Sequence, residues 1–435
     1  MPYRINITEI WNNLRIKQAA MLYSASFAGI PLSIFTSIVF TRFLGPQGYG
    51  DFSFIDSLFD FAIIIFPAGL FFAGNRALLL NKEPVKARQY YGATLVYLFL
   101  LFLVMTVCLV AYAFVDPNLA AKGLDRFFLM LIPAGWIFLL RPYFDNMLHA
   151  DNRIHDLAAT RFLPKVFTFS AALLIYYFAG GFAGNRLTVI WAIYLLAFLV
   201  VYLFVFFRIR VSFNNLGKRM QEIRAHHQNY GVHLYVGNLF SAGAISLTGI
   251  LISYFSANNT GVGFFALAVA ISRPMALIPG VVATTWFKDF AEKQSIPARL
   301  ASVTILLTLF AFAGLYLLAG PFVRFFYSDA FLPVIPLVHL AGIGMTLYGA
   351  GIFFSRFLEA HGHGKPVRNI HIAMGMALLT GNLLLIPTLG VTGAAIAMII
   401  ASAVYAGGMW WHYRKVKVEA ERKRSAELKE LGAEN

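Results

Sequence analysis

The chain has 435 residues, of which 59% are hydrophobic and 13% are charged, and its mean hydropathy is +0.69. Ordinary soluble domains keep about a quarter of their residues charged, so these values exclude that class and indicate a membrane protein. The net charge of +15 does not indicate nucleic-acid binding, because the basic residues lie in short connections between apolar segments. The only cysteine, Cys108, allows neither an internal disulfide nor a cysteine-based metal site.

About twelve apolar segments follow one another along the chain. A transmembrane helix needs about 20 mostly apolar residues. Windows bounded by charged residues and by Gly, Pro and Asn clusters predict spans at 19–40, 51–74, 90–114, 126–148, 157–179, 188–207, 230–255, 264–286, 300–319, 332–354, 369–386 and 391–411. The connections are too short for a further domain, so we predict one all-α integral membrane protein.

The two halves of the chain resemble each other at the start of their second spans. Residues 48–52 (GYGDF) match residues 261–265 (GVGFF), and six spans separate them. An even number of intervening spans gives both copies the same orientation. We therefore predict two parallel-repeat six-helix lobes, an N-lobe at 19–207 and a C-lobe at 230–411. The predicted remainder is an amphipathic N-terminal segment (1–18), a linker (208–229) and a basic tail (412–435).

The basic residues are distributed unequally between the two sides of the membrane. If the N-terminus is cytoplasmic, 26 of the 35 Lys and Arg residues fall on the cytoplasmic side, five on the opposite side and four inside spans. Cytoplasmic connections are enriched in Lys and Arg, so both termini are predicted to be cytoplasmic. The expected location is the plasma (inner) membrane, with the linker and the tail on its cytoplasmic side.

Seven charged residues inside the spans are the candidate site residues. A charge at the bilayer centre costs about 2.5–3.5 kcal/mol, so such residues usually face a protein interior or an aqueous cavity. Three pairs four residues apart share a helix face, namely Asp56 with Asp60, Arg141 with Asp145, and Arg161 with Lys165. Arg141 and Lys165 are predicted at similar depth, because span 4 descends towards the cytoplasm and span 5 climbs from it.

This arrangement predicts a basic cluster in the N-lobe that suits an anionic group, since Arg binds phosphate oxygens in a planar fork and Lys supplies a point charge. The alternative is an internal ion-pair network in which Asp145 neutralises Arg141, and Arg161 could instead snorkel to the inner interface. The three carboxylates, Asp56, Asp60 and Asp145, are candidates for gating or ion coupling.

The repeat alignment places Asp60 opposite Arg273, both about ten residues below the external surface. We hypothesise that this pair holds the lobes together on the outer side, and pairing within each lobe is the alternative. The histidines of His226-His227 and His361-Gly362-His363 are typical of loops, so no metal is predicted. The sequence has no nucleotide-binding or hydrolase motif, and no cofactor is predicted.

Three short motifs resemble those of polysaccharide transporter family flippases. Residues 41–50 (TRFLGPQGYG) are similar to the family's R-x-LG-x-x-x-YG opening. Asn382, followed by residues 387–397 (PTLGVTGAAIA), is similar to the asparagine, turn and G-x-x-GAA-x-A that precede the last spans. Residues 358–365 (LEAHGHGK) are similar to a cytoplasmic segment of the family.

The resemblance implies a member of the multidrug/oligosaccharidyl-lipid/polysaccharide (MOP) superfamily, with two six-helix lobes around a central cavity and alternating access. The implied function is the transfer of a polyprenyl-pyrophosphate-linked oligosaccharide from the inner to the outer leaflet, for surface polysaccharides such as O-antigen or exopolysaccharide. Implied partners are this lipid-linked oligosaccharide, membrane lipids and other membrane proteins of polysaccharide assembly. The residues expected to bind the pyrophosphate are Arg141, Lys165, Arg161 and Arg273. The sequence does not decide whether H⁺ or Na⁺ is the coupling ion.

Three other classes compete with this interpretation. A multidrug and toxin extruder (MATE) would take cations and use Asp56 and Asp60, but the basic cluster would not serve it. A membrane-embedded polysaccharide polymerase or ligase would carry catalytic groups on a large external loop, whereas the outer connections here have about twelve residues or fewer. A scaffold without transport would not need so many buried charges.

Overall fold

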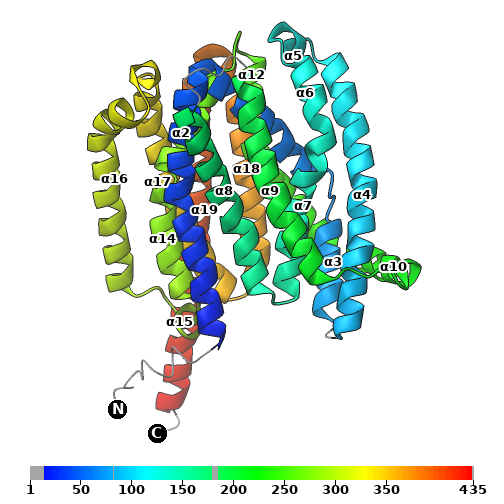
Figure 1. Ribbon diagram of the computed structural model, residues 1–435. Coiled ribbons are helices and arrows are strands. Elements are labelled where there is room, and N and C mark those ends of the chain that lie inside the picture. The colour runs from blue at the N-terminus through cyan, green and yellow to red at the C-terminus, as the bar shows by residue number, and fades with distance from the viewer. Residues whose placement is uncertain (1–13, 82, 179–184, 434–435) are drawn as a thin grey trace. The chain divides into compact units, whose positions relative to one another are not determined.

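The computed structural model describes residues 14–81, 83–178 and 185–433 (Figure 1), so the predicted amphipathic N-terminal segment lies largely outside the described residues. Within these ranges all regular secondary structure is helical and no strand is present. The predicted all-α class is confirmed.

The chain divides into two compact units, Met1–Val236 and Gly237–Asn435. The first unit contains α2 (Leu14–Ile65), α3 (Leu70–Leu79), α4 (Pro84–Val115), α5 (Pro117–Ala121), α6 (Asp125–Leu131), η1 (Ile132–Ala134), α7 (Gly135–Ala150), α8 (Ile154–Phe178), α9 (Arg186–Ile209), α10 (Leu216–His226), η2 (His227–Gly231) and most of α11 (Val232–Asn238). The second contains η3 (Leu239–Gly243), α12 (Ala244–Tyr254), α13 (Thr260–Ser272), α14 (Pro274–Thr285), α15 (Phe287–Glu292), α16 (Ala298–Phe326), η4 (Asp329–Phe331), α17 (Val334–Ala360), α18 (Gly364–Leu389) and α19 (Val391–Ala433). The lobe limits drawn from the sequence stay a prediction.

Ten helical segments of the described chain are long and apolar enough to cross a membrane. The first of them, Ala28–Ile65, lies in α2, and this one element covers the first predicted span and most of the second. The seventh predicted span contains η3, a π-helical segment, followed by α12, an apolar helix of only 11 residues. These two differences explain why the described chain has ten such segments and the sequence predicts twelve spans.

Gly45 divides α2 into two arms. Its φ of 72° and ψ of 179° are not helical, and glycine adopts positive φ without the steric cost of a Cβ. In Figure 1 the chain runs up the first arm and returns down the second. The glycine-rich turn in residues 41–50, the motif that resembles the flippase opening, is therefore a break between two membrane-crossing arms.

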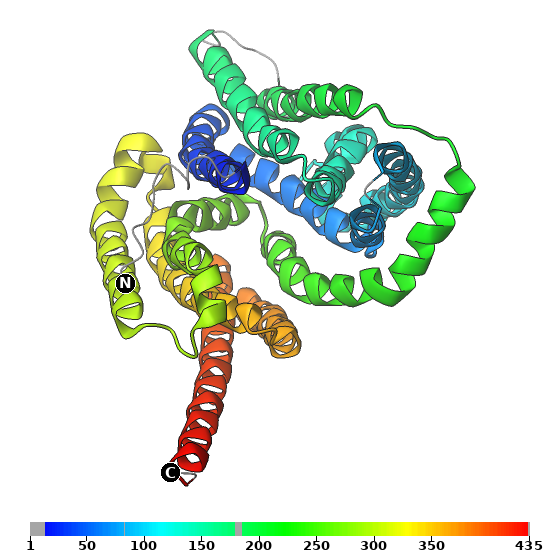
Figure 2. The ribbon, with the colours of Figure 1, turned by 90° about the horizontal axis from the view of Figure 1, so that it is seen from below.

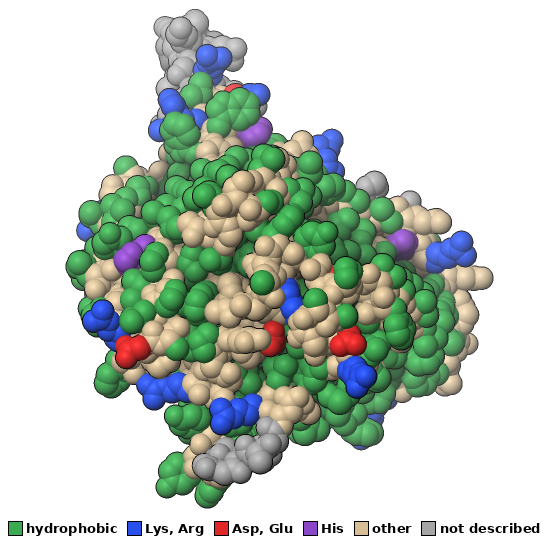
Figure 3. Space-filling model, turned by 90° about the horizontal axis from the view of Figure 1, so that it is seen from above, with side chains coloured by type: hydrophobic (Ala, Val, Ile, Leu, Met, Phe, Trp, Pro, Cys, Tyr) green, Lys and Arg blue, Asp and Glu red, His purple; other side chains and the backbone are tan. Residues whose placement is uncertain are grey.

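The outward surfaces of several helices are apolar. Val107 on α4 is 69% exposed and Phe310 on α16 is 81% exposed. Outward apolar surfaces of this kind are stable in hydrocarbon and costly in water, and the chain is a multi-pass membrane protein. Figure 3, seen from above, shows an end face, where charged side chains lie in small separate groups among hydrophobic and other side chains.

The predicted linker contains a helix, α10, which packs against α3 and α4. Buried Arg219 donates from Nε to Gln89 Oε1 at 3.0 Å and from Nη1 to both carboxylate oxygens of Glu222. The Tyr90 hydroxyl also donates to Glu222. Partial burial raises the pKa of the Glu222 carboxyl, but these hydrogen bonds outweigh it and the pKa lies below its ordinary value. The network fixes α10 to the first unit.

A second break separates α2 from α3. Ala68 and Gly69 have positive φ, so the chain leaves the helix there. The Ala68 carbonyl oxygen lies 2.8 Å from His227 Nε2, and the Tyr235 hydroxyl donates to the Ile65 carbonyl at 3.0 Å. Backbone carbonyls freed by the break thus find partners on η2 and α11, as a nonpolar surrounding requires.

The turn between α18 and α19 explains the second recognised motif. Gly390 has a φ of 58° and a ψ of −139°, which an L-residue rarely adopts. A Cβ on Gly393 would lie 2.2 Å from the Leu385 carbonyl oxygen, so only glycine allows the two helices to approach this closely. The fully buried Asn382 donates from Nδ2 to Thr248 Oγ1 at 2.8 Å, which links α18 to α12.

Candidate functional site

Four helices of the first unit, α2, α7, α8 and α9, pack together and carry most of the charged residues found inside the spans. Together these charged side chains form what we call the intramembrane charge cluster, consisting of Asp56 and Asp60 on α2, Arg141 and Asp145 on α7, and Arg161 and Lys165 on α8. Three carboxyl groups thus accompany three basic groups, rather than the basic excess seen when spans 4 and 5 are considered alone.

Arg141 pairs with Asp60 across the contact between α7 and α2. Arg141 Nη1 lies 3.5 Å from Asp60 Oδ1, and the two side chains are 51% and 39% exposed. Asp56, one turn earlier on α2, lies within electrostatic range of both. Its Oδ1 atom is buried and has no hydrogen-bond partner among the described residues. The Arg141 guanidinium is therefore held by one long ion pair beside a second carboxyl group.

Asp145 pairs with Arg161 and not with Arg141. The Arg161 Nε to Asp145 Oδ1 distance is 2.8 Å, which joins α7 to α8. Lys165 Nζ donates to the Gly29 carbonyl oxygen at 3.3 Å, which joins α8 to the first arm of α2. A Cβ on Gly29 would lie 2.9 Å from Lys165 Nζ, so this glycine leaves space for the ammonium group.

Arg141 and Lys165 reach α2 at similar distances from its break. Gly29 precedes Gly45 by 16 residues and Asp60 follows it by 15. At 1.5 Å per residue both contacts lie roughly 22–24 Å along their arms. In Figure 1 the second arm leans away from the first, so equal lengths along the two arms do not give equal depth, and the similar depth of Arg141 and Lys165 stays a prediction.

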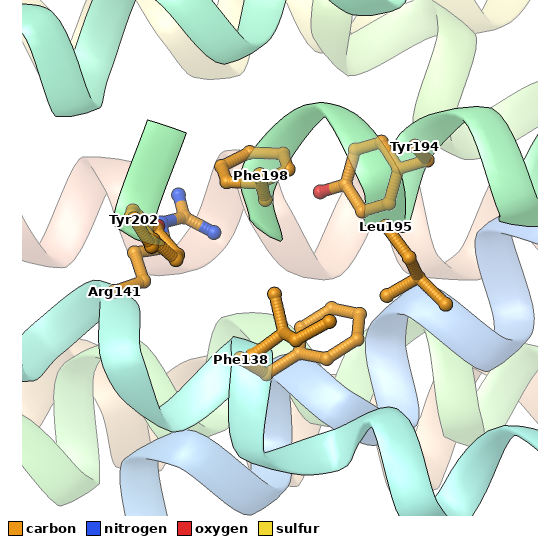
Figure 4. A pocket seen from close by; sticks show the side chains of 7 residues that line it. Phe138, Arg141, Tyr194, Leu195, Phe198 and Tyr202 are labelled. Carbon is orange, nitrogen blue, oxygen red and sulfur yellow. The ribbon is translucent and has the colours of Figure 1, made fainter. Parts of the chain in front are cut away.

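Arg141 also borders a small pocket. Its walls are Ile137 and Phe138 on α7 together with Tyr194, Leu195, Phe198 and Tyr202 on α9. Figure 4 shows the guanidinium directed towards the α9 side chains and the Tyr194 hydroxyl directed across the pocket. The pocket has room of about 10 Å³, enough for about one water molecule, so a pyrophosphate group requires this region to open further.

Tyr194, Phe198 and Tyr202 form an aromatic row along one face of α9. The ring centroids are 5.0 Å apart for the first pair and 5.6 Å for the second. Residues four apart in a helix lie above one another, which places all three beside Arg141. The charge-based prediction does not include these three residues, although their four-residue spacing within the sixth predicted span is visible in the sequence.

Arg273 belongs to the second unit. Its side chain is exposed at the junction of α13 and α14, where Pro274 interrupts the helical hydrogen bonds, and it lies within electrostatic range of Tyr348 on α17. The same unit holds Arg356 and Glu359, paired at 2.7 Å near the end of α17. The ion pair described for Asp60 joins it to Arg141, within its own unit.

One histidine of each predicted loop pair, His227 and His361, contacts backbone carbonyl groups. His361 lies 2.9 Å from the Phe357 carbonyl through Nδ1 and 3.1 Å from the Lys293 carbonyl through Nε2. Among the residues that the structure describes, no group of three or more His, Cys, Asp or Glu side chains is placed to hold a metal ion.

No family model matches the sequence, and no curated protein matches it. Solved structures do match. The chain is similar to "Lipid II flippase MurJ, inward closed conformation", with a TM-score of 0.71 and 14% identity over 92% of this chain and 90% of that one. It is also similar to an inward-facing multidrug resistance MATE family transporter of the MOP superfamily, with a TM-score of 0.70 and 16% identity over 90% and 95%. A further match is a MOP superfamily transporter from Pyrococcus furiosus Vc1, with a TM-score of 0.56 and 16% identity over 92% and 95%.

The class of protein follows from these matches. The chain is an all-α membrane protein with the fold of MOP superfamily transporters, as the sequence resemblance implied. Flippases and multidrug transporters share this fold, so the fold alone does not choose between their substrates.

Proposed function

We propose that the protein is a flippase that moves a polyprenyl-pyrophosphate-linked oligosaccharide from the inner to the outer leaflet of the plasma membrane. It acts by alternating access and serves the synthesis of a surface polysaccharide such as O-antigen or exopolysaccharide. Both termini are cytoplasmic, as the distribution of Lys and Arg predicts.

The observation that carries the proposal is the environment of Arg141. Its guanidinium is half-exposed, borders an aromatic pocket and has a long, 3.5 Å ion pair with Asp60. A planar guanidinium can exchange such a partner for two shorter, charge-assisted bonds to phosphate oxygens. Lys165 is a second basic group of the cluster, and we assign to the same headgroup Arg161, which would exchange its ion pair with Asp145, and Arg273 in the second unit.

The aromatic row suits the sugars of the same substrate. Tyr194, Phe198 and Tyr202 offer flat apolar faces, and the two hydroxyl groups add polar contacts. A site with an apolar wall and a few placed polar groups is the usual form of a small-molecule site. Arg141 would then bind the headgroup while the aromatic row contacts the adjoining sugar.

Breaks in the helices support alternating access. Gly45 interrupts α2, the segment 66–69 separates α2 from α3, and Arg273 separates α13 from α14. Few-residue breaks of this kind absorb the backbone rotations of a transport cycle. The fold matches come from transporters, which supports transport rather than catalysis.

A second candidate is a MATE-type exporter of cations. Asp56 favours it, because a buried carboxylate oxygen without a hydrogen bond is stabilised when a proton or a Na⁺ ion binds. The same feature also suits ion coupling in a flippase, with Asp60 and Asp145 beside it. However, Arg141 is the one charged residue in the lining of the described pocket, so an anionic group is attracted there and a cationic group is repelled.

The proposal is tested by deleting the gene and locating the polyprenyl-linked oligosaccharide with a membrane-impermeant glycan-modifying reagent. Accumulation in the inner leaflet is the expected result. An unchanged leaflet distribution with shorter surface chains would instead indicate a polymerase, and no change in either would favour the cation exporter.

A further inference from the structure

Helix α19 has two distinct faces within the membrane-crossing part of the second unit. Met409 is fully buried, and the Tyr413 hydroxyl accepts a hydrogen bond from the Ile296 backbone N–H at 3.2 Å, so this face packs inward. On the opposite face Ile400 and Val404 are 45% and 37% exposed. The outward face is thus apolar up to this level, as contact with acyl chains requires.

The same outward face becomes aromatic and then basic. Trp410 and Trp411 are 46% and 58% exposed, and Arg414, Lys415 and Arg422 are exposed beyond them. Val404 and Arg414 are separated by about 15 Å at 1.5 Å per residue. Tryptophan is enriched where hydrocarbon meets headgroups, so this sequence of side chains follows the transition from the bilayer core to its charged surface.

Each tryptophan carries a basic group one turn later. The Arg414 guanidinium carbon lies 5.0 Å from the centre of the Trp410 ring, and Lys415 Nζ lies 5.9 Å from that of Trp411. These contacts hold the two positive groups close to the level of the indole rings. Among the described residues no carboxylate lies within ion-pair distance of either group, and Glu419 is one turn further on.

We propose that this surface, defined as the α19 basic face and formed by Trp410, Trp411, Arg414, Lys415 and Arg422, binds the phosphate headgroups of anionic phospholipids. The helix crosses the membrane and extends beyond the ends of α17 and α18 in the second unit (Figure 2), so the face continues a lipid-facing surface. Positive charge next to an anionic leaflet attracts its lipids, and the tryptophans fix the depth of contact. This binding does not depend on which substrate the protein transports.

The test uses the full-length protein in proteoliposomes and the quenching of tryptophan fluorescence by brominated lipids. Brominated phosphatidylglycerol is compared with brominated phosphatidylcholine at the same mole fraction. The unmodified protein is expected to favour phosphatidylglycerol. The R414Q/K415Q variant keeps both tryptophans and should lose about five-fold in selectivity for each charge removed, the effect of one basic residue near an anionic surface. Added salt should reduce the preference of the unmodified protein.

Two further variants make the result specific. R126Q/R324Q removes two exposed charges elsewhere and should leave the preference unchanged. W410F/W411F removes two of the six tryptophans, the two on the α19 basic face, and should reduce the lipid preference to the part that the other four tryptophans report. Equal quenching by both lipids, the same preference in R414Q/K415Q, or an undiminished preference in W410F/W411F would each overturn the proposal, as would displacement of the lipid by millimolar inorganic phosphate.

Discussion

Replacing Gly393 by alanine tests the packing that explains the recognised motif at the entry to α19. A Cβ at this position would lie 2.2 Å from the Leu385 carbonyl oxygen and 2.5 Å from its carbon. The first distance is about 1.2 Å short of the 3.4 Å at which ordinary contact begins, and the obstacle is backbone that cannot rotate away. Insertion of one methyl group into such a contact costs about 1–3 kcal/mol.

The matched control is Gly407→Ala in the same helix. Gly407 has no heavy atom within 4 Å of the added Cβ, and alanine is the better helix former by about 1 kcal/mol. Thermal unfolding in detergent, followed by the loss of monodisperse protein, should therefore show a lower transition temperature for G393A and an equal or higher one for G407A. Equal effects of the two substitutions would refute the close approach of α18 and α19.

Three further predictions concern single contacts. Asp60→Asn should change the free energy of unfolding by about 1 kcal/mol or less, because its ion pair with Arg141 is long and half-exposed. It should nevertheless alter transport, because Arg141 loses this carboxylate partner, and measuring the melting temperature and the flipping rate of the same variant tests both effects. Glu222→Gln should make the melting temperature less dependent on pH. The lowered pKa of the Glu222 carboxyl stabilises the folded protein above the ordinary pKa of 4.5, and this stabilisation is lost as the pH falls through the folded-state pKa. A variant whose melting temperature falls with acid as much as that of the unmodified protein would contradict this. Asn382→Ala should destabilise by about 1–2 kcal/mol, because it removes a buried bond to Thr248 and leaves a small cavity, and Thr248→Ala should add little to it.

The helical architecture was predictable from sequence because apolar length and charge placement are local signals. Each predicted span from 90 to 207 and from 264 to 411 overlaps a long helix of the structure. The break at Gly45 and the π-helical segments η2 and η3 changed the element limits without changing the class. These features depend on contacts with other helices, which residue windows do not contain.

The site was predictable in composition and not in pairing. All six charged residues of the intramembrane cluster are predictable from the sequence, since charge is rare in an apolar segment. Their partners depend on neighbouring helices: Arg141 pairs with Asp60, 81 residues away, while Asp145, four residues from Arg141, pairs with Arg161. Spacing along one helix identifies a shared face, but the nearest opposite charge in space decides the ion pair.

The most direct test of the proposed function is reconstituted transport with the unmodified protein and the R141Q and R141K variants. Proteoliposomes carry a fluorescent polyprenyl-pyrophosphate oligosaccharide, and its exposure is followed with a membrane-impermeant quencher. The account predicts flipping by the unmodified protein, its loss in R141Q at unchanged melting temperature, and partial recovery in R141K. Proton-coupled transport of a lipophilic cation that R141Q leaves intact, with no movement of the lipid-linked sugar, would contradict it.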